Sequence, residues 1–562
     1  MLRRHLAASV ARTASQRLGL GVVALGVSCL VFVAGWGACA DGGGSRDVAD
    51  TDDTAEADTP DSAEADTHVP DSAEADTREP DTDEPDTHGD THVDAGPELP
   101  YEALSPAPIA ADADFAAFFT LDRVARVELR VEAAEWAALL QHMRDYAATD
   151  SAMRSGRYFR ATFVYHRDDG SDEVVPDIGF RTRGNTTRTI PQDRDGIFHK
   201  AHFKLKFDAT FDLVPGTAEY VARDERRFHG VKELDLKWSR DDDPSQIREL
   251  FAWETMRLAG VLAPRTTPVA LTFVLGDEVV PFGLYLGLES IDKPFLTRRL
   301  GKDDNDGDLY KCLWLKEGPA TLEPITNPRA VGVKDWTTNY RPAYDLQTNE
   351  AGATHARLED LIATLDTAGG EALEAWLDAS FDVEGFLRAL AVNVLVGMPD
   401  DYWAMGNNYY LYFGAPRGRF IPWDYDHGLG GGWAGEPAWS HEGIADSDVL
   451  VWKNLNAAFG RPGTRHPLVD KLLARPRYRA RYLTLLASLS DPTRGLFSDA
   501  RWSALYAAQA PLYAPHLDNA ADEGELMEDT GVEHAYFQRR LAAVRAQLAA
   551  LYAAGAFRTE PR

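Results

Sequence analysis

The chain has 562 residues and a formal net charge of −31, from 58 Lys and Arg against 89 Asp and Glu residues. Apolar residues make up 44% of the chain, with 13 Trp, 20 Tyr and 24 Phe, which excludes a wholly disordered protein. The acidic balance argues against a nucleic-acid partner, because phosphate backbones attract Lys and Arg. Three cysteines cannot form a disulfide framework, and only Cys312 lies in the expected folded body.

Residues 1–39 have the pattern of a signal and lipidation segment. Arginines at positions 3, 4, 12 and 17 precede residues 18–38, which carry no charged side chain, as in an export signal. The segment ends Gly-Trp-Gly-Ala-Cys39, which resembles a bacterial lipobox, although Trp36 stands where an aliphatic residue is usual. We predict an exported lipoprotein of the cell envelope, on the outer membrane or cell surface, bound to the membrane by a lipid anchor on Cys39. An uncleaved signal anchor and plain secretion are the alternatives.

Residues 40–99 form an acidic, repetitive segment. Positions 41–99 contain 21 acidic and two basic residues, and the block Pro-Asp-Ser-Ala-Glu-Ala-Asp-Thr occurs at 60–67 and again at 70–77. Apart from Leu99 the segment has no Leu, Ile, Phe, Tyr or Trp, so it has no core to offset the entropy of ordering. We predict a disordered tether between the membrane and the folded body.

Residues 100–290 read as a strand-rich lobe. Between Phe203 and Phe207 apolar residues alternate with Lys204 and Lys206, which indicates a strand with one buried face and one cationic face. A helix is expected to begin at Asp243, with this residue as its N-cap. Strands are predicted at 124–131, 158–165, 177–183, 199–208, 268–275 and 279–289, and helices at 132–146 and 243–260.

Residues 291–562 read as a helical lobe. Helices are predicted at 355–366, 370–377, 382–397, 466–489, 500–513 and 532–553. One hairpin interrupts them, with strands at 408–413 and 419–423. No linker-like composition separates the two halves of the body. The expected fold class is therefore α+β, as one two-lobed unit.

Acids and amides flank this hairpin at both ends. Asp400, Asp401, Asn407 and Asn408 lead into its first strand, and its second strand runs into Trp423-Asp424-Tyr425-Asp426. Pairing of the strands brings these side chains together, and hard oxygen ligands of this kind suit Mg²⁺ or Mn²⁺ better than Zn²⁺. The order of acid, Asn, hairpin and acid is that of protein kinases. Each residue taken singly also suits a turn or a cap.

The strand-rich half offers groups for phosphate binding. Residues 179–188 are a strand that runs into a small, polar, basic loop, whose N–H groups, hydroxyls and Arg side chains suit phosphates. Lys200, Lys204 and Lys206 are candidates for a phosphate-contacting lysine. Glu254 lies on the apolar stripe of the helix at 243–260 and needs a partner there. That partner is either the strand lysine, as in kinases, or an arginine at the edge of the face.

These segments together resemble the CotH kinase family, which is related to atypical, secreted protein kinases. The resemblance rests on an ordered series from about residue 124 to about residue 490. Its members are the loop at 178–187, the strand at 200–207, the helix ending at Gly260 with Ala263-Pro264 after it, Gly283-Leu284-Tyr285 with Glu289, Asp308-Leu309-Tyr310-Lys311, Asn408-Tyr409-Tyr410-Leu411-Tyr412, and Trp423-Asp424-Tyr425-Asp426. The last two, in this order and with this gap, are the most specific.

The resemblance implies an atypical kinase-like, two-lobed fold that binds ATP with Mg²⁺ or Mn²⁺ and phosphorylates Ser or Thr of a protein in the cell envelope or coat. Asp401 matches the catalytic Asp of the family, Asp424 its metal-binding Asp, and Asn408 the Asn that opens the tyrosine-rich strand. Asp400 is an equally plausible neighbour of Asp401. Asp426 is an alternative or additional metal ligand, because Asp426-His427-Gly428 could mimic the kinase metal motif in place of Asp424.

The resemblance also nominates residues for nucleotide binding. The basic loop of the family lines the phosphate site, which nominates Arg183 and Asn185. Lys204 is the first choice and Lys200 the second choice for the lysine that contacts ATP. Glu254 and Glu289 complete this set.

Two other functions remain open. One is a catalytically silent CotH-like module for surface adhesion or envelope assembly on a lipid anchor. The other is a metal-dependent transferase or hydrolase for another nucleotide-linked or phosphorylated substrate. The presence of every acid of the hairpin set favours the kinase, since a silent domain has no physical need for them.

Overall fold

The computed structural model describes residues 97–185, 188–239, 243–432, 441–517, 519–521 and 527–559. The chain divides between Ala95 and Gly96, and residues 96–562 form one compact unit. The predicted signal and lipidation segment at 1–39, and the predicted tether at 40–99 except for its last three residues, lie outside the described residues. Within the described ranges, no helix has the length and apolar character needed to cross a membrane.

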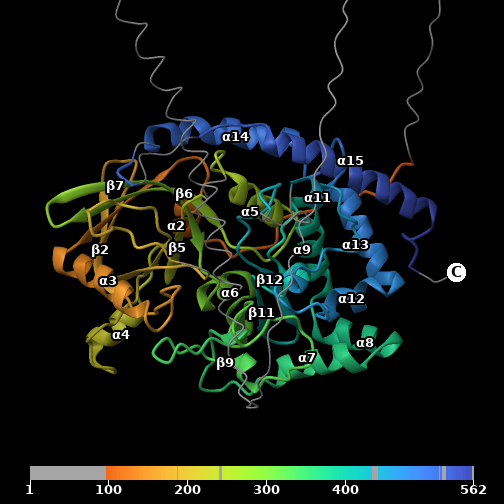
Figure 1. The fold of residues 1–562 in the computed structure, drawn as a ribbon, viewed down its shortest axis with the longest axis horizontal. Coiled ribbons are helices and arrows are strands. Elements are labelled where there is room, and N and C mark those ends of the chain that lie inside the picture. The colour runs from red at the N-terminus through yellow and green to blue at the C-terminus, as the bar shows by residue number, and fades with distance from the viewer. Residues whose placement is uncertain are drawn as a thin grey trace, which may run out of the picture. The chain divides into compact units, whose positions relative to one another are not determined.

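Seven strands of the first half close into a barrel, drawn in orange to olive in Figure 1. Their order around the barrel is β1-β2-β3-β4-β5-β7-β6, and the parallel pairing of β1 with β6 closes it. The strands are β1 (Ala125–Val131), β2 (Phe159–His166), β3 (Asp172–Thr182), β4 (Phe203–Lys206), β5 (Glu233–Lys237), β6 (Thr266–Leu275) and β7 (Glu278–Glu289). The strand-rich half is therefore confirmed, but its closure into a barrel and the strand β5 are additions to the prediction.

An aromatic core fills the barrel. Phe163, Phe180, Phe203 and Phe273 are all fully buried in it, and each such side chain contributes roughly 1.5–3 kcal/mol by leaving water. The helix α3 (Ala133–Tyr146) adds Trp136, whose ring centroid lies 5.1 Å from that of Phe273. The apolar residues of each strand point into this core, so the charged residues of the strands lie on the outer face of the barrel.

The short strands β4 and β5 carry the alternation that positions the site. Leu234 and Leu236 of β5 are fully buried in the barrel core, which leaves Glu233, Asp235 and Lys237 on the outer face. In the ladder between the two strands, Asp235 lies opposite Lys204 of β4. The outer face of the barrel is thus a ladder of opposite charges.

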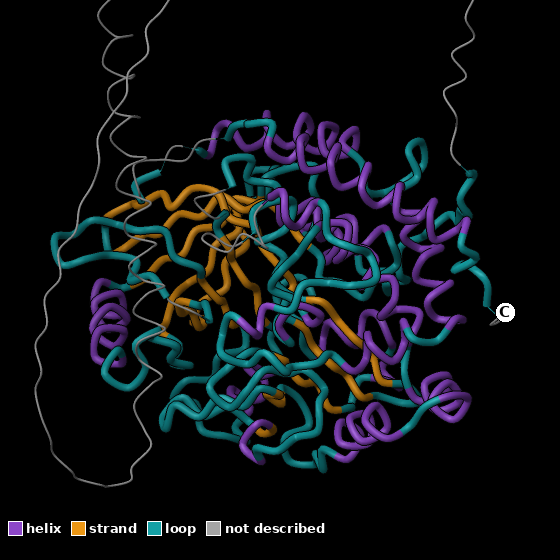
Figure 2. Tube along the Cα trace, turned by 45° about the vertical axis from the view of Figure 1, so that its right-hand side comes forward, coloured by secondary structure: helices purple, strands orange, loops and turns teal. Residues whose placement is uncertain are grey.

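The second half contains helices and a second sheet. The predicted hairpin is present as β11 (Tyr409–Phe413) and β12 (Gly418–Pro422), but it belongs to a five-stranded sheet with the order β12-β11-β8-β10-β9. Figure 2 shows these strands apart from those of the barrel. The expectation of a single isolated hairpin was wrong, because β8 (Asp308–Cys312), β9 (Val331–Gly332) and β10 (Tyr344–Leu346) are too short for a clear pattern.

The predicted helices of this half are present with small shifts. The expected helix at 466–489 is two helices, because Arg475 is extended before Pro476. Besides α3 and α5 (Arg248–Leu258), the described residues form the helices α2 (Ala113–Phe118), α4 (Ala218–Asp224), α6 (Lys293–Leu300), α7 (Ala356–Thr367), α8 (Gly370–Ser380), α9 (Val383–Val396), α10 (Tyr402–Met405), α11 (His441–Ala445), α12 (Pro467–Leu473), α13 (Pro476–Leu489), α14 (Asp499–Tyr513) and α15 (Val532–Ala553), with the 3-10 turns η1 (Lys302–Asp304), η2 (Pro328–Ala330), η4 (Leu455–Ala457) and η5 (Ala514–His516).

The helix α5 (Arg248–Leu258) follows β5 and belongs to the core of the helical half, where Trp253 and Met256 are fully buried. It begins five residues later than predicted. Gln246 has a φ of +60°, which no α-helix contains, and Asp243 instead accepts a hydrogen bond from the Arg248 backbone N–H at 3.2 Å. The later start puts Glu249 in the first turn of α5, close to the end of β5.

Candidate active site

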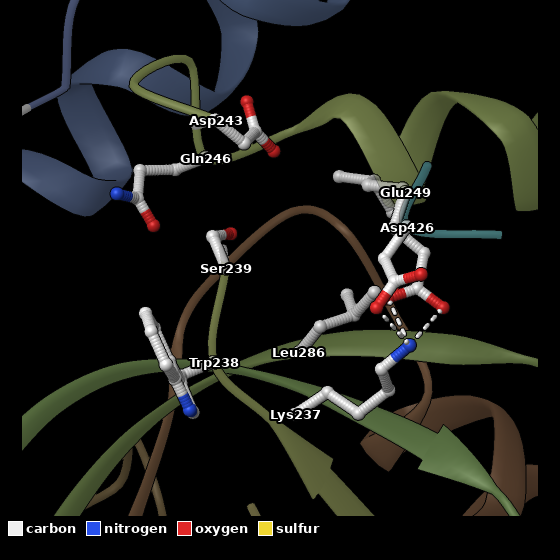
Figure 3. Close-up of a pocket in the computed structure, with 9 residues that line it drawn as sticks. Lys237, Trp238, Ser239, Asp243, Gln246, Glu249, Leu286 and Asp426 are labelled. Carbon is white, nitrogen blue, oxygen red and sulfur yellow. Dashed lines mark hydrogen bonds and ion pairs between the residues drawn. The ribbon is translucent and has the colours of Figure 1, made fainter. Parts of the chain in front are cut away.

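A buried lysine contacts three carboxylates at the place where β5, α5 and the end of the hairpin meet. Lys237 is 3% exposed, and its Nζ lies 2.8 Å from Oε2 of Glu249 and 3.5 Å from Oδ2 of Asp426, and it also contacts Oδ1 of Asp424. Figure 3 shows Lys237 directed toward the carboxylates of Glu249 and Asp426 in a pocket that Trp238 and Gln246 also line. One ammonium group therefore links a helix of the core to the acids after the hairpin.

The cluster carries more negative than positive charge. Burial lowers the pKa of Lys237, but Asp424, Asp426 and Glu249 together raise it above its ordinary value. Burial, with the charges of Asp426 and Asp424, raises the pKa of Glu249 to about 7 in spite of Lys237. Asp424 keeps a pKa below its ordinary value, because Lys237 and Arg183 outweigh the effect of its burial. The site can thus accept a further cation.

Both ends of the hairpin have a left-handed backbone. Asn408, just before β11, has a φ of +53°, and Asp424, two residues after β12, has a φ of +64°. The Trp423 N–H donates to the Asn408 carbonyl at 3.1 Å, so the two ends are joined directly. Non-glycine residues in this conformation are uncommon and occur often at functional sites. The backbone itself brings the Asn and the acid side by side.

Asp400 and Asp401 have different partners. Oδ1 and Oδ2 of Asp400 accept hydrogen bonds from the side chains of Asn407 at 2.7 Å and Asn408 at 2.8 Å. Burial raises its pKa to about 6; His427 and Asn407 oppose this rise, and the charges of Asp424 and Asp426 add to it. Asp400 therefore belongs to the electrostatic neighbourhood of the acid cluster.

Asp401 is occupied in holding the local fold. Its Oδ1 accepts from the Ala404 N–H at 2.8 Å, which makes it the N-cap of α10, and its Oδ2 accepts from Nδ2 of Asn393 at 2.6 Å. Asn393 in turn accepts from the Tyr425 hydroxyl at 2.9 Å. This chain of bonds ties α9, α10 and the residue between the two acids into one unit.

A second group of charges lies beside the acids. Nε of Arg183 is 2.9 Å from Oδ1 of the buried Asp235, and its guanidinium lies 5.8 Å from the ring centre of Trp423. Lys204 binds the same aspartate at 3.3 Å and Glu233 at 2.9 Å. The fields of Asp235 and Asp424 both act on Arg183, which places this residue between the two groups.

The other predicted residues lie as follows. Lys200 is buried, donates to the Phe282 carbonyl and lies 4.9 Å from the ring centre of Tyr285. Glu289 is fully buried against Arg298 and Arg299. Asn185 is half-buried and precedes Thr186 and Thr187, which lie outside the described residues.

For Glu254, the structure selects the arginine alternative. Its carboxylate pairs with Arg257 at 2.6 Å, one turn further along α5. The kinase-like pairing of a strand lysine with a helix glutamate is present, but Lys237 and Glu249 make it. Neither residue was predicted from the sequence. The alternation of Leu234 and Leu236 with Asp235 and Lys237 is the signal that indicates β5 and its lysine. Glu249 was missed because the helix was expected to begin at Asp243, so that Glu249 did not fall in its first turn.

The donor chemistry near Lys237 fits a hard divalent cation. In the described part of the chain, no three or more His, Cys, Asp or Glu side chains are already arranged to hold a metal ion. Mg²⁺, however, commonly takes only one or two carboxylates and completes its shell with water and phosphate oxygens. Asp424 and Asp426 supply such a pair in a cluster with excess negative charge. Asn408 uses its amide nitrogen on Asp400, so its oxygen is the atom that would reach a metal.

A family model described as CotH kinase protein matches residues 180–545. The chain belongs to the CotH kinase family. The match begins near the end of β3 and runs into α15, so it starts and ends later than the series from about residue 124 to about residue 490 on which the resemblance rests. A search of curated proteins finds no match to the chain. Membership of the CotH kinase family agrees with the Lys–Glu pair and the acids after the hairpin, which are the parts that kinases use.

Proposed function

We propose that this protein is an ATP- and divalent-metal-dependent kinase that phosphorylates Ser or Thr of a protein. One observation carries the proposal: Lys237 binds Glu249 of α5 and, at the same time, the two acids that follow the hairpin. In protein kinases a strand lysine pairs with a helix glutamate and reaches the nucleotide phosphates, next to a metal-binding aspartate. In this proposal the barrel takes the place of the strand-rich lobe of a kinase, and the helical half takes that of the other lobe.

Each residue then has a role. Lys237 contacts phosphate oxygens and is held in place by Glu249. Asp424 and Asp426 hold Mg²⁺ or Mn²⁺, with the amide oxygen of Asn408 as a further ligand. ATP, when bound, supplies the γ-phosphoryl group. Arg183 balances charge on the phosphate side.

Asp400 is the better candidate for the group that orients the acceptor. The charges of Asp424 and Asp426 act on Asp400, and its hydrogen bonds come from the two asparagines that open the hairpin, whereas Asp401 caps α10 and binds Asn393. Asp400 would accept the proton of the Ser or Thr hydroxyl as the oxygen of that hydroxyl bonds to the γ-phosphorus and the bond to ADP breaks.

The test is transfer of label from γ-labelled ATP to generic protein acceptors with Mg²⁺ or Mn²⁺. We expect transfer by the wild-type protein and a loss of at least 100-fold in Lys237→Met and Asp424→Asn. Lys293→Met, at an exposed lysine of α6 paired with Asp306, is the matched control and should retain activity. Absence of both transfer and metal-dependent ATP binding would reject the kinase and favour a silent surface module.

Export to the cell envelope and a lipid anchor belong to the same proposal. They rest on residues 1–39 of the sequence alone. Metabolic labelling with a radioactive fatty acid, compared between the wild-type protein and Cys39→Ser, tests the anchor. Label that persists in the Cys39→Ser protein would rule out lipidation at this cysteine.

A further inference from the structure

Lys311 of β8 is a half-buried lysine that pairs with no acid in the part of the chain that the structure describes. Its Nζ makes none of the hydrogen bonds or ion pairs found among the described residues, and it lies 5.4 Å and 5.7 Å from the ring centres of Trp423 and Tyr410. The aspartate opposite it in the sheet, Asp345, is bound by Lys334 at 2.8 Å instead. Aromatic faces attract a cation, but they do not accept its three hydrogen bonds.

The neighbours of Lys311 are also cations. Burial and the charges of Arg183 and Lys204 lower the pKa of Lys311 to about 7, and Asp235 offsets only part of this effect. Asp235 is already shared between Arg183 and Lys204. Within the described ranges, the carboxylate of Asp235 therefore faces three cationic groups, and Glu233 pairs with Lys204 and, at 3.7 Å, with Lys206.

Trp423 connects this group to the acid cluster. Arg183 and Lys311 both lie over its ring, and the next residue in the chain is Asp424. The indole Nε1 of Trp423 is buried and has no acceptor among the described residues. Lys311 and Trp423 thus leave two kinds of N–H donor without an oxygen partner, which is costly in a protein interior.

We infer that Lys311, Arg183 and Lys204 form a subsite for a phosphate-type oxyanion beside Asp424. An oxyanion supplies the missing acceptors, and Lys and Arg side chains are the groups that bind phosphate oxygens in proteins. The inference rests on the proposed function and deepens it, since the subsite adds Lys311 to the residues that hold substrate. Two sources share this chemistry, the polyphosphate of a nucleotide and a phosphorylated or acidic group next to the acceptor hydroxyl.

Calorimetry on the full chain tests the subsite directly. The probes are tripolyphosphate and phosphoserine, both without metal, and the variants are Lys311→Met, Lys311→Arg and the control Lys293→Met. We expect Lys311→Met to weaken binding of tripolyphosphate at least tenfold, Lys311→Arg to restore most of it, and Lys293→Met to leave it unchanged. A tenfold loss for phosphoserine alone would also support the subsite and identify the acceptor as the source of the anion.

The same variants separate a binding role from a structural one. A half-buried lysine without an acid partner costs free energy, so Lys311→Met should keep or raise the midpoint of thermal unfolding. If Lys311→Met fails to fold, Lys311→Gln takes its place in the binding experiment. Unchanged affinity for both probes in the Lys311→Met or Lys311→Gln protein overturns the subsite.

A parallel experiment distinguishes failure of the subsite proposal from failure of the kinase proposal. In Lys237→Met, binding of ATP with Mg²⁺ should fall. If it does not fall and no label is transferred by the wild-type protein, the kinase proposal fails, while the tripolyphosphate result still decides the role of Lys311. If ATP binding depends on Lys237 but the affinity for tripolyphosphate and phosphoserine is unchanged in the Lys311 variants, the kinase proposal stands and the subsite is rejected.

Discussion

Asp400 and Asp401 are neighbours in sequence with opposite roles in the structure. The side chain of Asp400 reaches the two asparagines that open the hairpin, whereas Asp401 caps α10 and binds Asn393. The sequence predicted an acidic site residue just before the hairpin, but it did not show whether this residue is Asp400 or Asp401. The choice depends on where α10 begins, and a helix of four residues gives too weak a pattern to place its cap.

Substitution of each of these two aspartates separates activity from stability. Asp400→Asn should lower phosphate transfer at least 100-fold with little change in unfolding, because it removes a charge at the site. Asp401→Ala should destabilise the fold by about 1–2 kcal/mol through loss of the helix cap. Transfer assays and chemical denaturation of both variants check this. Loss of activity in a stable Asp401→Asn protein, with Asp400→Asn fully active, would reverse the assignment.

His466 should make stability depend on pH. It is 4% exposed, and burial lowers its pKa from 6.5 to about 3. The unfolded chain therefore binds a proton below pH 6.5 that the folded protein does not take up until about pH 3, so stability is complete above pH 6.5 and falls as the pH decreases. The loss from this residue is about 2 kcal/mol at pH 5.

Urea denaturation at pH 7.5 and pH 5 measures this effect. His466→Gln should reduce the difference between the two values by about the same 2 kcal/mol. The pKa of the half-buried His202 is also lowered to about 3, by loss of hydration and then by Arg183 and Lys237, so part of the pH dependence should remain. An identical pH dependence in the wild-type protein and His466→Gln would contradict the prediction.

At the scale of elements, α5 joins the site to the helical core. Its side chains pack among α9, α14 and α15, and its first turn supplies Glu249 to Lys237. Glu249 and Glu254 lie on one helix but differ in environment. Glu249 is buried in the acid cluster, whereas Glu254 is half-buried and pairs with Arg257. The register of the helix, and not its amphipathic pattern, decides which glutamate reaches the lysine.

Substitution of each glutamate by Gln tests this difference within one helix. Glu249→Gln should raise the KM for ATP and lower turnover at least tenfold, because Lys237 loses the partner that positions it. Glu254→Gln should change activity less than twofold. Equal losses in the two variants would show that the helix as a whole, and not the Lys237–Glu249 pair, supports activity.

At the scale of the molecule, the strands at the barrel closure are far apart in sequence. β1 pairs in parallel with β6, from Ala125 opposite Val269 to Val131 opposite Leu275. The alternation between Phe203 and Phe207 showed which face of β4 is buried, and this part of the fold could be predicted, whereas β5 was missed. Strand order could not, because partners separated by over a hundred residues leave no local pattern. The Lys237 cluster also depends on such a distant contact, because Asp424 lies 187 residues after Lys237, so its geometry could not be predicted either.

The C-terminal helix is part of this architecture. Glu533 of α15 is fully buried and pairs with Arg248 of α5 at 2.9 Å, while Phe537 packs on Phe251 at 5.3 Å. Glu533→Gln should destabilise the protein by about 3 kcal/mol, because it removes the charge opposite a buried arginine. Asp378→Asn, in the exposed pair with Arg477, should change stability by less than about 0.5 kcal/mol. Equal unfolding free energies for the two variants would exclude a special role for the α5–α15 contact.

The left-handed backbone at Asn408 and Asp424 determines which substitutions are informative there. Asn and Asp tolerate this conformation better than other residues with a side chain, so Asp424→Asn and Asn408→Asp change charge while keeping the turn. Alanine at either position adds backbone strain to the chemical change, and a β-branched residue adds more. An alanine scan of this hairpin would therefore report distorted turns and lost ligands together. Exchanges between Asn and Asp form a four-member set that keeps the turn, in which Asn408→Asp also removes the hydrogen bond from the Asn408 amide to Asp400.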